Sequence, residues 1–441
     1  MKTDSNFIFF KKHSSSIPKG FLWGISTSAT QVEGADSQDG KTYSVWSPNL
    51  KMISSQACDS YNRISEDLEL LTELGVNSYR FSISWSRIFP CALVNQKGLD
   101  FYDRLIDELL KRNIEPFITM FHYDLPLWIY EKTHGWHNTE TIEYFLKYGE
   151  TLLSNFSDRV KLWTSFNQPS RISHRSYIDG VLHPFIKNEY SASFKAAHNI
   201  LKSHHKLYRL KESEYPGISL GIVNSHTYFQ NLKTDDEFCT DLANQYENLW
   251  FYEPLVNGKY CDDLSGIVLE NGWISENQVT DALDFKNSVD FFGVNYYTRK
   301  FVTQDAENIM GFKILKNEKS TPSERGHEIY AKGLYQSVEE ICQKYSLPVY
   351  ITENGIDCRE AENDYDRCNY IKEHIKEVIN ICENKMDLKG YFIWTLLDCF
   401  EWSSNYDLKF GLVGVDRKNK LKRNKKKSFE FYKRVLEVLK K

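Results

Sequence analysis

The sequence predicts an α/β fold, a single (β/α)8 TIM barrel, from three observations. Short apolar, β-branched or aromatic segments recur eight times and alternate with helical patterns. Near-continuous apolar segments are typical of strands buried on both faces, and strand–helix alternation indicates a parallel sheet. No stretch rich in Pro, Ser or Gly divides the 441 residues into compositionally different halves. We therefore expect residues 1–441 to form one closed barrel domain.

The predicted strands follow one another at intervals that leave room for helices. In chain order they are FLWGIST from Phe21, SYRFSIS from Ser78, PFITMFHY from Pro116, VKLWTSFNQ from Val160, SLGIVNS from Ser219, FFGVNYYT from Phe291, PVYITENG from Pro348 and GYFIWTLL from Gly390. Amphipathic patterns at 65–75 and 100–113 are typical of the helices between them. An open doubly wound sheet is the alternative, but it needs a Gly-rich phosphate loop after its first strand, and FLWGISTSAT has one glycine.

Two segments depart from the alternation. Residues 303–326 are polar and loop-like, and we interpret them as an excursion from the domain. Residues 417–427, RKNKLKRNKKK, are strongly basic and allow two interpretations, a nucleic-acid patch or a solvated loop before a last amphipathic helix at 429–439. We favour the loop.

Composition limits the class of protein. With 55 basic and 60 acidic residues and 15% aromatics, the chain is neither disordered nor enriched in positive charge, so no nucleic-acid partner is expected. No run of about 18 apolar residues predicts a membrane span, and the apolar cluster at 7–10 is too short for a signal peptide. Nine scattered cysteines without C-x-x-C favour free thiols. We expect a cytoplasmic protein; the oligomeric state is left open.

Neither a metal site nor a cofactor site is expected. His198, His204 and His205 lie in a predicted helix at 190–211, where satisfied or surface histidines are the favoured interpretation. The chain has no G-x-S-x-G motif and no phosphate-binding loop.

Polar side chains follow nearly every predicted strand. A barrel builds its active site at the carboxyl ends of its strands. The side chains found there are Gln31 with Glu33, Arg80, His122 with Asp124, Asn167 with Gln168, Asn224 with His226, Asn295 with Tyr297, Glu353 with Asn354, and Glu401 with Trp402. A polar loop explains each one alone, but the amino ends of the strands show no matching set. Hydrogen-bonding groups beside indole rings suit a sugar; the tryptophans expected in this pocket are Trp23, Trp128, Trp394 and Trp402.

Several motifs strongly resemble the family-1 glycoside hydrolases, the β-glucosidase family. They are ITENG (351–355), SFNQP (165–169), SYRFSISWSRIFP (78–90), FHYDLP and FIWTLLDCFEW, and the resemblance extends over residues 18–438. It implies a single (β/α)8 domain that hydrolyses small β-linked glycosides with retention of configuration.

The resemblance also implies roles for individual residues. Glu353 resembles the nucleophile, with Arg80 and Tyr297 as its charge and hydrogen-bond partners, and Asn295 resembles an amide near the reaction centre. The residues that resemble the sugar-binding set are Gln31, His122, Asn167, Glu401 and Trp402, with Trp394 as a stacking platform. A carboxylate at Glu401 would repel a 6-phosphate, which favours an unphosphorylated sugar.

One departure from the family pattern affects the chemistry. The family motif T-F-N-E-P carries the general acid/base as its Glu, and this chain has Gln168 there. A retaining glycosidase uses two carboxyl groups about 5–5.5 Å apart, and acid–base catalysis contributes about 10²–10⁴-fold. An amide preserves the shape but cannot supply the proton. Milder departures are Tyr123 and His327 for Trp, and Cys399 for Asn.

Three hypotheses account for Gln168. It is an engineered trap, or a natural residue as in the plant thioglucosidases (myrosinases), whose aglycone leaves without protonation. In those enzymes an arginine at the position of Arg175 meets an anionic aglycone, although a surface-loop arginine is the favoured interpretation here. Third, the chain is a non-hydrolytic relative that binds a glycoside, or one that transfers glycosyl groups from activated donors. The intact Glu353 favours a retaining β-glycosidase whose acid/base function is impaired or bypassed. The aglycone half of its pocket is expected in loops near 174–188, 303–326 and 403–408.

Overall fold

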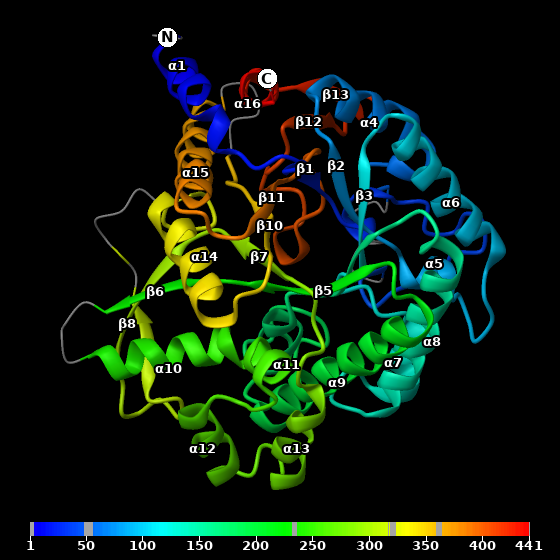
Figure 1. The fold of residues 1–441 in the computed structure, drawn as a ribbon. Coiled ribbons are helices and arrows are strands. Elements are labelled where there is room, and N and C mark those ends of the chain that lie inside the picture. The colour runs from blue at the N-terminus through cyan, green and yellow to red at the C-terminus, as the bar shows by residue number, and fades with distance from the viewer. Residues whose placement is uncertain are drawn as a thin grey trace.

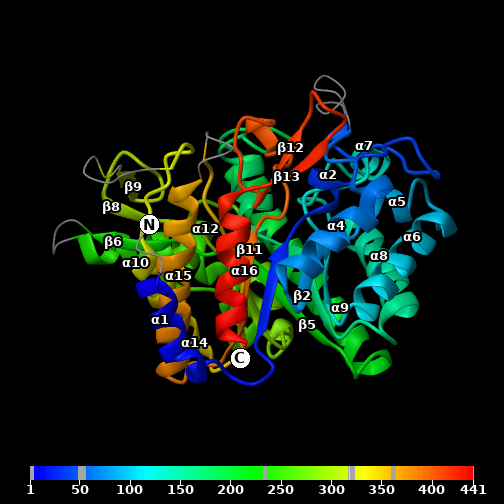
Figure 2. The same cartoon turned by 90° about the horizontal axis from the view of Figure 1, so that it is seen from above.

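A closed barrel of eight parallel strands forms the centre of the molecule (Figure 1, Figure 2). The computed structural model describes residues 4–47, 56–231, 236–315, 317, 323–358 and 364–440. The strands close in the order β1-β11-β10-β7-β5-β4-β3-β2. Their bounds are β1 (Leu22–Ser26), β2 (Ser78–Ser82), β3 (Glu115–Phe121), β4 (Leu162–Asn167), β5 (Ser219–Ser225), β7 (Phe292–Tyr296), β10 (Val349–Asn354) and β11 (Leu388–Trp394). The predicted (β/α)8 barrel is confirmed, and each predicted strand is one of its strands.

Helices surround the barrel (Figure 1). They are α1 (Asp4–His13), α2 (Ala29–Val32), α4 (Ser60–Leu74), α5 (Trp85–Ile88), α6 (Gln96–Lys111), α7 (Leu127–Thr133), α8 (Glu140–Phe156), α9 (Tyr190–Glu214), α10 (Glu237–Glu247), α11 (Glu253–Asn257), α12 (Asp262–Glu270), α13 (Glu276–Asp281), α14 (Ala331–Tyr345), α15 (Tyr365–Glu383) and α16 (Lys427–Leu439). On α4, Leu68, Leu71 and Leu74 are buried and recur every three residues, because one stripe of the helix faces the strands. The helices predicted at 65–75, 100–113, 190–211 and 429–439 correspond to α4, α6, α9 and α16.

Three phenylalanine rings pack together in a cluster of their own among the barrel strands. Phe117 lies 5.7 Å from Phe291 and 5.6 Å from Phe392, ring centre to ring centre, in edge-to-face contacts. Space for these rings comes from glycines: a Cβ at Gly24 would overlap the ring of Phe392, and one at Gly221 would lie 2.5 Å from Phe291. Small and large side chains on neighbouring strands therefore fill this part of the barrel together.

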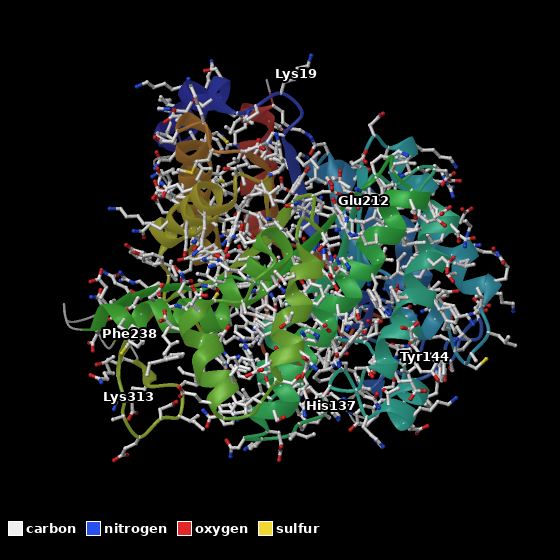
Figure 3. The ribbon with its side chains drawn as sticks, turned by 60° about the horizontal axis from the view of Figure 1, so that its bottom comes forward. Lys19, His137, Tyr144, Glu212, Phe238 and Lys313 are labelled. Atoms are coloured by element: carbon white, nitrogen blue, oxygen red, sulfur yellow. The ribbon has the colours of Figure 1, made fainter. Side chains whose placement is uncertain are left out.

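The polar segment at 303–326 contains regular structure. Its first residues complete β8 (Arg299–Gln304), and β9 (Phe312–Leu315) pairs antiparallel with β8. With β6 (Tyr228–Asn231), these strands form a three-stranded sheet outside the barrel. Figure 3 shows Phe238 of α10 and Lys313 of β9 on this side of the molecule. The loop interpretation is corrected for β8 and β9, while residues 316 and 318–322 lie outside the described residues.

The basic segment at 417–427 also differs from the expected solvated loop. β12 (Val413–Asp416) and β13 (Lys422–Lys425) pair as an antiparallel hairpin. Buried Arg423 pairs with Asp67 at 3.0 Å, and buried Lys426 pairs with Asp398 at 2.7 Å. Two of the basic side chains thus form buried ion pairs within the protein, and the expectation of a solvated loop is wrong for them.

The first and last helices of the described chain pack against each other. Phe7 of α1 and Phe431 of α16 are 5.9 Å apart, and α1 and α16 are neighbours in Figure 1 and Figure 2. Among the described residues, no helix combines the length and the apolar composition needed to cross a bilayer.

The packing of Phe392 predicts the effect of Gly24→Ala. The added Cβ would overlap that ring, so we expect the free energy of unfolding to fall by about 1–3 kcal/mol. Gly266→Ala in α12, where a Cβ meets nothing within 4 Å, is the matched control. It should be neutral or stabilising by up to about 1 kcal/mol. Denaturant unfolding of both variants measures this, and equal effects would contradict the packing argument.

Candidate active site

The site residues named from the family resemblance converge on one pocket at the carboxyl ends of the barrel strands. The pocket holds about 380 Å³ of empty space, part of it open to solvent. Its lining consists of His122, Tyr123, Asn167, Gln168, Arg171, Tyr297, Arg325, His327, Glu353, Trp394, Glu401, Trp402 and Phe410. Three more of these site residues, Arg80, Asn295 and Gln31, are buried behind it and hydrogen-bond to residues of the lining.

The Glu353 carboxylate is held by a cation and a hydroxyl. Arg80 Nη1 donates to Oε1 at 2.8 Å, and the Tyr297 hydroxyl donates to Oε2 at 2.7 Å. Burial and the nearby Glu353 charge raise the pKa of Tyr297 well above its ordinary value, so its hydroxyl remains a donor. Arg80 is fully buried, and its Nη2 also donates to Asn167 Oδ1 at 2.8 Å. Each carboxylate oxygen of Glu353 therefore accepts one hydrogen bond, and the two bonds fix the orientation of the side chain.

A chain of hydrogen bonds orients the amides around Arg80. Thr352 Oγ1 donates to Asn295 Oδ1 at 2.7 Å, and Asn295 Nδ2 donates to Asn167 Oδ1 at 3.0 Å. Asn167 Nδ2 is 3.0 Å from His122 Nε2, which must then be the acceptor. Burial lowers the pKa of His122 well below its ordinary value, so the neutral ring carries its proton on Nδ1. That Nδ1 has no hydrogen-bond partner among the described residues.

The Glu401 carboxyl group is buried and makes only long polar contacts. Its Oε1 is 3.3 Å from both Trp394 Nε1 and Gln31 Nε2, and its Oε2 is 3.6 Å from an Arg325 nitrogen. Burial raises the pKa of Glu401 to about 7, against the opposing effect of Arg325. The Trp402 ring lies 6.1 Å from the His122 ring in a stacked arrangement, so it forms one wall of the pocket.

The amide of Gln168 is oriented by Tyr123. The Tyr123 hydroxyl donates to Gln168 Oε1 and lies 3.5 Å from Asn167 Nδ2, which donates to it. Because Oε1 accepts from Tyr123, the Nε2 side of the amide is left as a donor, and it has no partner among the described residues. The pocket therefore has a carboxylate at position 353 and an amide donor at position 168.

Several side chains from the sequence prediction lie elsewhere. Trp23 is the second residue of β1, far from the carboxyl end of the strand, and its ring centre lies 4.8 Å from that of Phe21. The Trp128 indole N–H donates to the Phe89 carbonyl oxygen at 2.9 Å. Neither lines the pocket, so their prediction as pocket residues is wrong. The other polar side chains absent from the lining have partners of their own: Glu33 pairs with Arg87, Asp124 accepts from the Trp85 N–H, Asn224 accepts from Ser170, His226 faces Glu340, and Asn354 donates to Tyr296 and Tyr370.

The histidines of α9 are structural. His204 lies 2.6 Å from both Ser165 Oγ and the Ser288 carbonyl oxygen, and burial lowers its pKa to about 4. No group of His, Cys, Asp and Glu in the described part of the chain could hold a metal ion.

The arginine at position 175 is already paired. It belongs to the π-helical turn Arg171–Arg175, forms an ion pair with Asp179, and lies 3.4 Å from Glu247. It therefore differs from the expected surface-loop arginine. Arg171, by contrast, lines the pocket, as does Arg325. Neither arginine was predicted as a site residue from the sequence, although Arg171 follows Gln168 by one helical turn.

Comparison with known proteins identifies the family. The model for glycosyl hydrolase family 1 matches residues 13–440. Beta-glucosidase A of Thermotoga maritima is 38% identical over 421 residues, covering 90% of this chain and 93% of the relative. Beta-glucosidase 4 of Oryza sativa subsp. japonica is 32% identical over 458 residues, covering 95% and 94%. The chain belongs to glycosyl hydrolase family 1.

A solved structure agrees with this membership. The beta-glucosidase from Thermotoga maritima in complex with castanospermine superposes with a TM-score of 0.90 at 34% identity, covering 96% of this chain and 98% of that one. Family 1 membership confirms the predicted enzyme class, a glycoside hydrolase of the β-glucosidase type.

The environment of Glu401 predicts how stability depends on pH. Its ordinary pKa is 4.5 and its folded pKa is about 7, so between these values the folded chain holds a proton that the unfolded chain has released. Stability is therefore lost as the pH rises through this window. We expect Glu401→Gln to raise the free energy of unfolding by up to about 3 kcal/mol at pH 8 and by much less at pH 4.5.

Denaturant unfolding at the two pH values measures this difference. Glu69→Gln, at an exposed position of α4, is the control and should show no pH-dependent gain. A gain of equal size at both pH values for Glu401→Gln would rule out desolvation of the carboxylate as its cause.

Proposed function

We propose that this chain is a retaining β-glycosidase that acts on an unphosphorylated β-glycoside through a covalent intermediate on Glu353, with Gln168 unable to act as acid or base. The observation that carries the proposal is the placement of Glu353. Its carboxylate is held by Arg80 and Tyr297 in the pocket whose lining also presents the Gln168 amide. The names of the relatives, beta-glucosidases, support a glucose-like sugar.

In the first step, a Glu353 oxygen attacks the anomeric carbon, and the bond between that carbon and the leaving-group atom breaks. The leaving group departs with the bonding electron pair. Because Gln168 has no proton to transfer, the leaving group departs as an anion unless solvent protonates it. In the second step, water attacks the anomeric carbon, Glu353 leaves as a carboxylate, and the proton of the water passes to solvent. Without a protein base this second step is slow.

The remaining pocket residues suit recognition of a sugar. The His122 Nδ1–H offers a donor, while Glu401 offers acceptors beside Gln31. The indoles of Trp394 and Trp402 provide flat apolar surfaces for a sugar ring. We assign these groups to the sugar and the Gln168 side of the pocket to the leaving group.

Two alternatives use the same residues differently. A thioglucosidase-like or transglycosylating enzyme would act on activated leaving groups, which need no proton from Gln168. A non-hydrolytic relative would bind a glycoside only. The positioned carboxylate of Glu353 favours catalysis, because a binding protein requires no nucleophile.

Glycosides with a good leaving group should reveal the covalent intermediate. We expect 2,4-dinitrophenyl β-glucoside to give a burst of about one dinitrophenolate per enzyme, followed by slow turnover, since only the second step lacks its base. Mass spectrometry should detect the glycosyl group on Glu353, and azide should release a β-glycosyl azide. Glu353→Gln should abolish the burst; an unchanged burst in that variant would refute the assignment of Glu353.

Restoring a carboxyl group at position 168 tests the role of the amide. We expect Gln168→Glu to raise kcat/KM for cellobiose and for alkyl glucosides by about 10²–10⁴-fold, since these leaving groups need a proton. Dinitrophenyl glucoside should gain little in the first step. Assays on both classes of substrate, with a thioglucoside beside them, separate the hypotheses. No gain on any O-glycoside would favour the binding protein.

A further inference from the structure

Arg171 is a pocket cation without a partner. Its guanidinium makes no hydrogen bond and no ion pair with any described residue, and its Nε is buried without a partner. Its backbone N–H donates to the Gln168 carbonyl at 2.9 Å, at the start of the π-helical turn Arg171–Arg175. Arg171 is therefore anchored beside Gln168, on the side of the pocket that we assign to the leaving group.

The neighbouring cations each have a carboxylate. Arg80 is 2.8 Å from Glu353, and Arg325 is 3.6 Å from Glu401. Arg175 and Lys300 share Glu247, at 3.4 and 3.9 Å. Arg171 is the one cation in this group that has no described carboxylate at ion-pair distance.

Against the effect of its burial, Lys300, Arg175 and Arg171 lower the pKa of Glu247, so Arg171 acts on this carboxylate at longer range without forming an ion pair with it. The other neighbouring side chains add no negative charge. Gln168 is a neutral amide, and its Nε2 is a donor. Burial, reinforced by Arg325 and Arg171, lowers the pKa of His327 to about 3, so this ring is neutral near pH 7. Tyr123 and Tyr297 remain protonated, because burial raises the pKa of each. The leaving-group side thus presents donors and one cation that has no ion-pair partner among the described residues.

We propose that this side of the pocket selects glycosides whose aglycone carries an oxyanion (a carboxylate, sulfate or phosphate) bound by the Arg171 guanidinium. The proposal rests on the proposed function for the location of the sugar. A planar guanidinium pairs with an oxyanion through two parallel hydrogen bonds, and a partly desolvated cation without a partner is costly until a ligand supplies one. An amide at position 168 fits this ligand, because a carboxylate there would repel the oxyanion and compete for Arg171.

Ligands that cannot be hydrolysed separate binding from turnover. We would measure, by calorimetry on the intact chain, the dissociation constants of 4-carboxyphenyl β-C-glucoside and of its methyl ester. In both ligands the anomeric carbon is bonded directly to a carbon of the aglycone, so there is no glycosidic C–O bond to hydrolyse. We expect the carboxylate to bind about tenfold more tightly than the ester, and this preference to shrink between 50 and 500 mM NaCl, because salt screens the ion pair.

Variants assign the preference to one guanidinium. Arg171→Gln should abolish it while leaving the affinity for the methyl ester within about twofold, and Arg171→Lys should retain part of it, because the charge remains without the planar fork. Arg175→Gln, which removes an arginine already paired with Asp179 and Glu247, is the matched control and should keep the preference.

Three results would overturn the proposal: no preference in the intact chain, a preference that persists in Arg171→Gln, or one that disappears in Arg175→Gln instead. The first of these requires no variant to fold. The binding experiment can also fail or succeed independently of the burst experiment that tests the proposed function. A carboxylate preference without any burst from dinitrophenyl glucoside would leave the binding site standing and remove the hydrolytic mechanism.

Discussion

The buried guanidinium of Arg80 links three barrel strands at the centre of the site. It extends from β2, donates to Asn167 at the end of β4 and to Glu353 on β10, and is fully shielded from solvent. A charge in such a place is tolerated only when it is paired and hydrogen-bonded. The order of the strands therefore has to bring β2, β4 and β10 to the same end of a closed barrel. Hydrogen bonds continue from this centre to further strands. They run from Thr352 to Asn295, from Asn295 to Asn167 and from Asn167 to His122, so each side chain orients its neighbour.

The second feature of the site is its balance of charge. Glu353 and Glu401 each face an arginine, and Glu247 faces two cations. Position 168 contributes no charge, and Arg171 contributes one that has no ion-pair partner in the described part of the chain. Under the proposed mechanism, such a pocket supplies no proton to an ordinary leaving group, and the Arg171 cation is left to bind an anionic ligand. The two features complement each other in the proposed function, since an anionic aglycone would be repelled by a carboxylate at position 168.

Local sequence patterns predicted the barrel well for a physical reason. Strands such as β4 and β10 are buried on both faces, so they appear as apolar segments with a polar end, and the barrel geometry collects those ends. The same reasoning failed for Trp23 and Trp128, because the local sequence around a tryptophan does not show whether its ring packs in the core or lines the pocket. It also failed for Arg423 and Lys426, whose buried partners Asp67 and Asp398 are distant in sequence.

The sequence by itself determined the strand order along the chain, the expected family, and the chemical identity of each strand end, including the amide at position 168. Local periodicity and short motifs depend on neighbouring residues, so one chain is enough to see them. Only the tertiary structure decided which charges are paired. Arg171 and Arg175 look alike in sequence, four residues apart in one segment. Folding brings Asp179 and Glu247 to Arg175 and leaves Arg171 in the pocket with no described carboxylate at ion-pair distance, because pairing depends on distances in space between residues that the sequence separates.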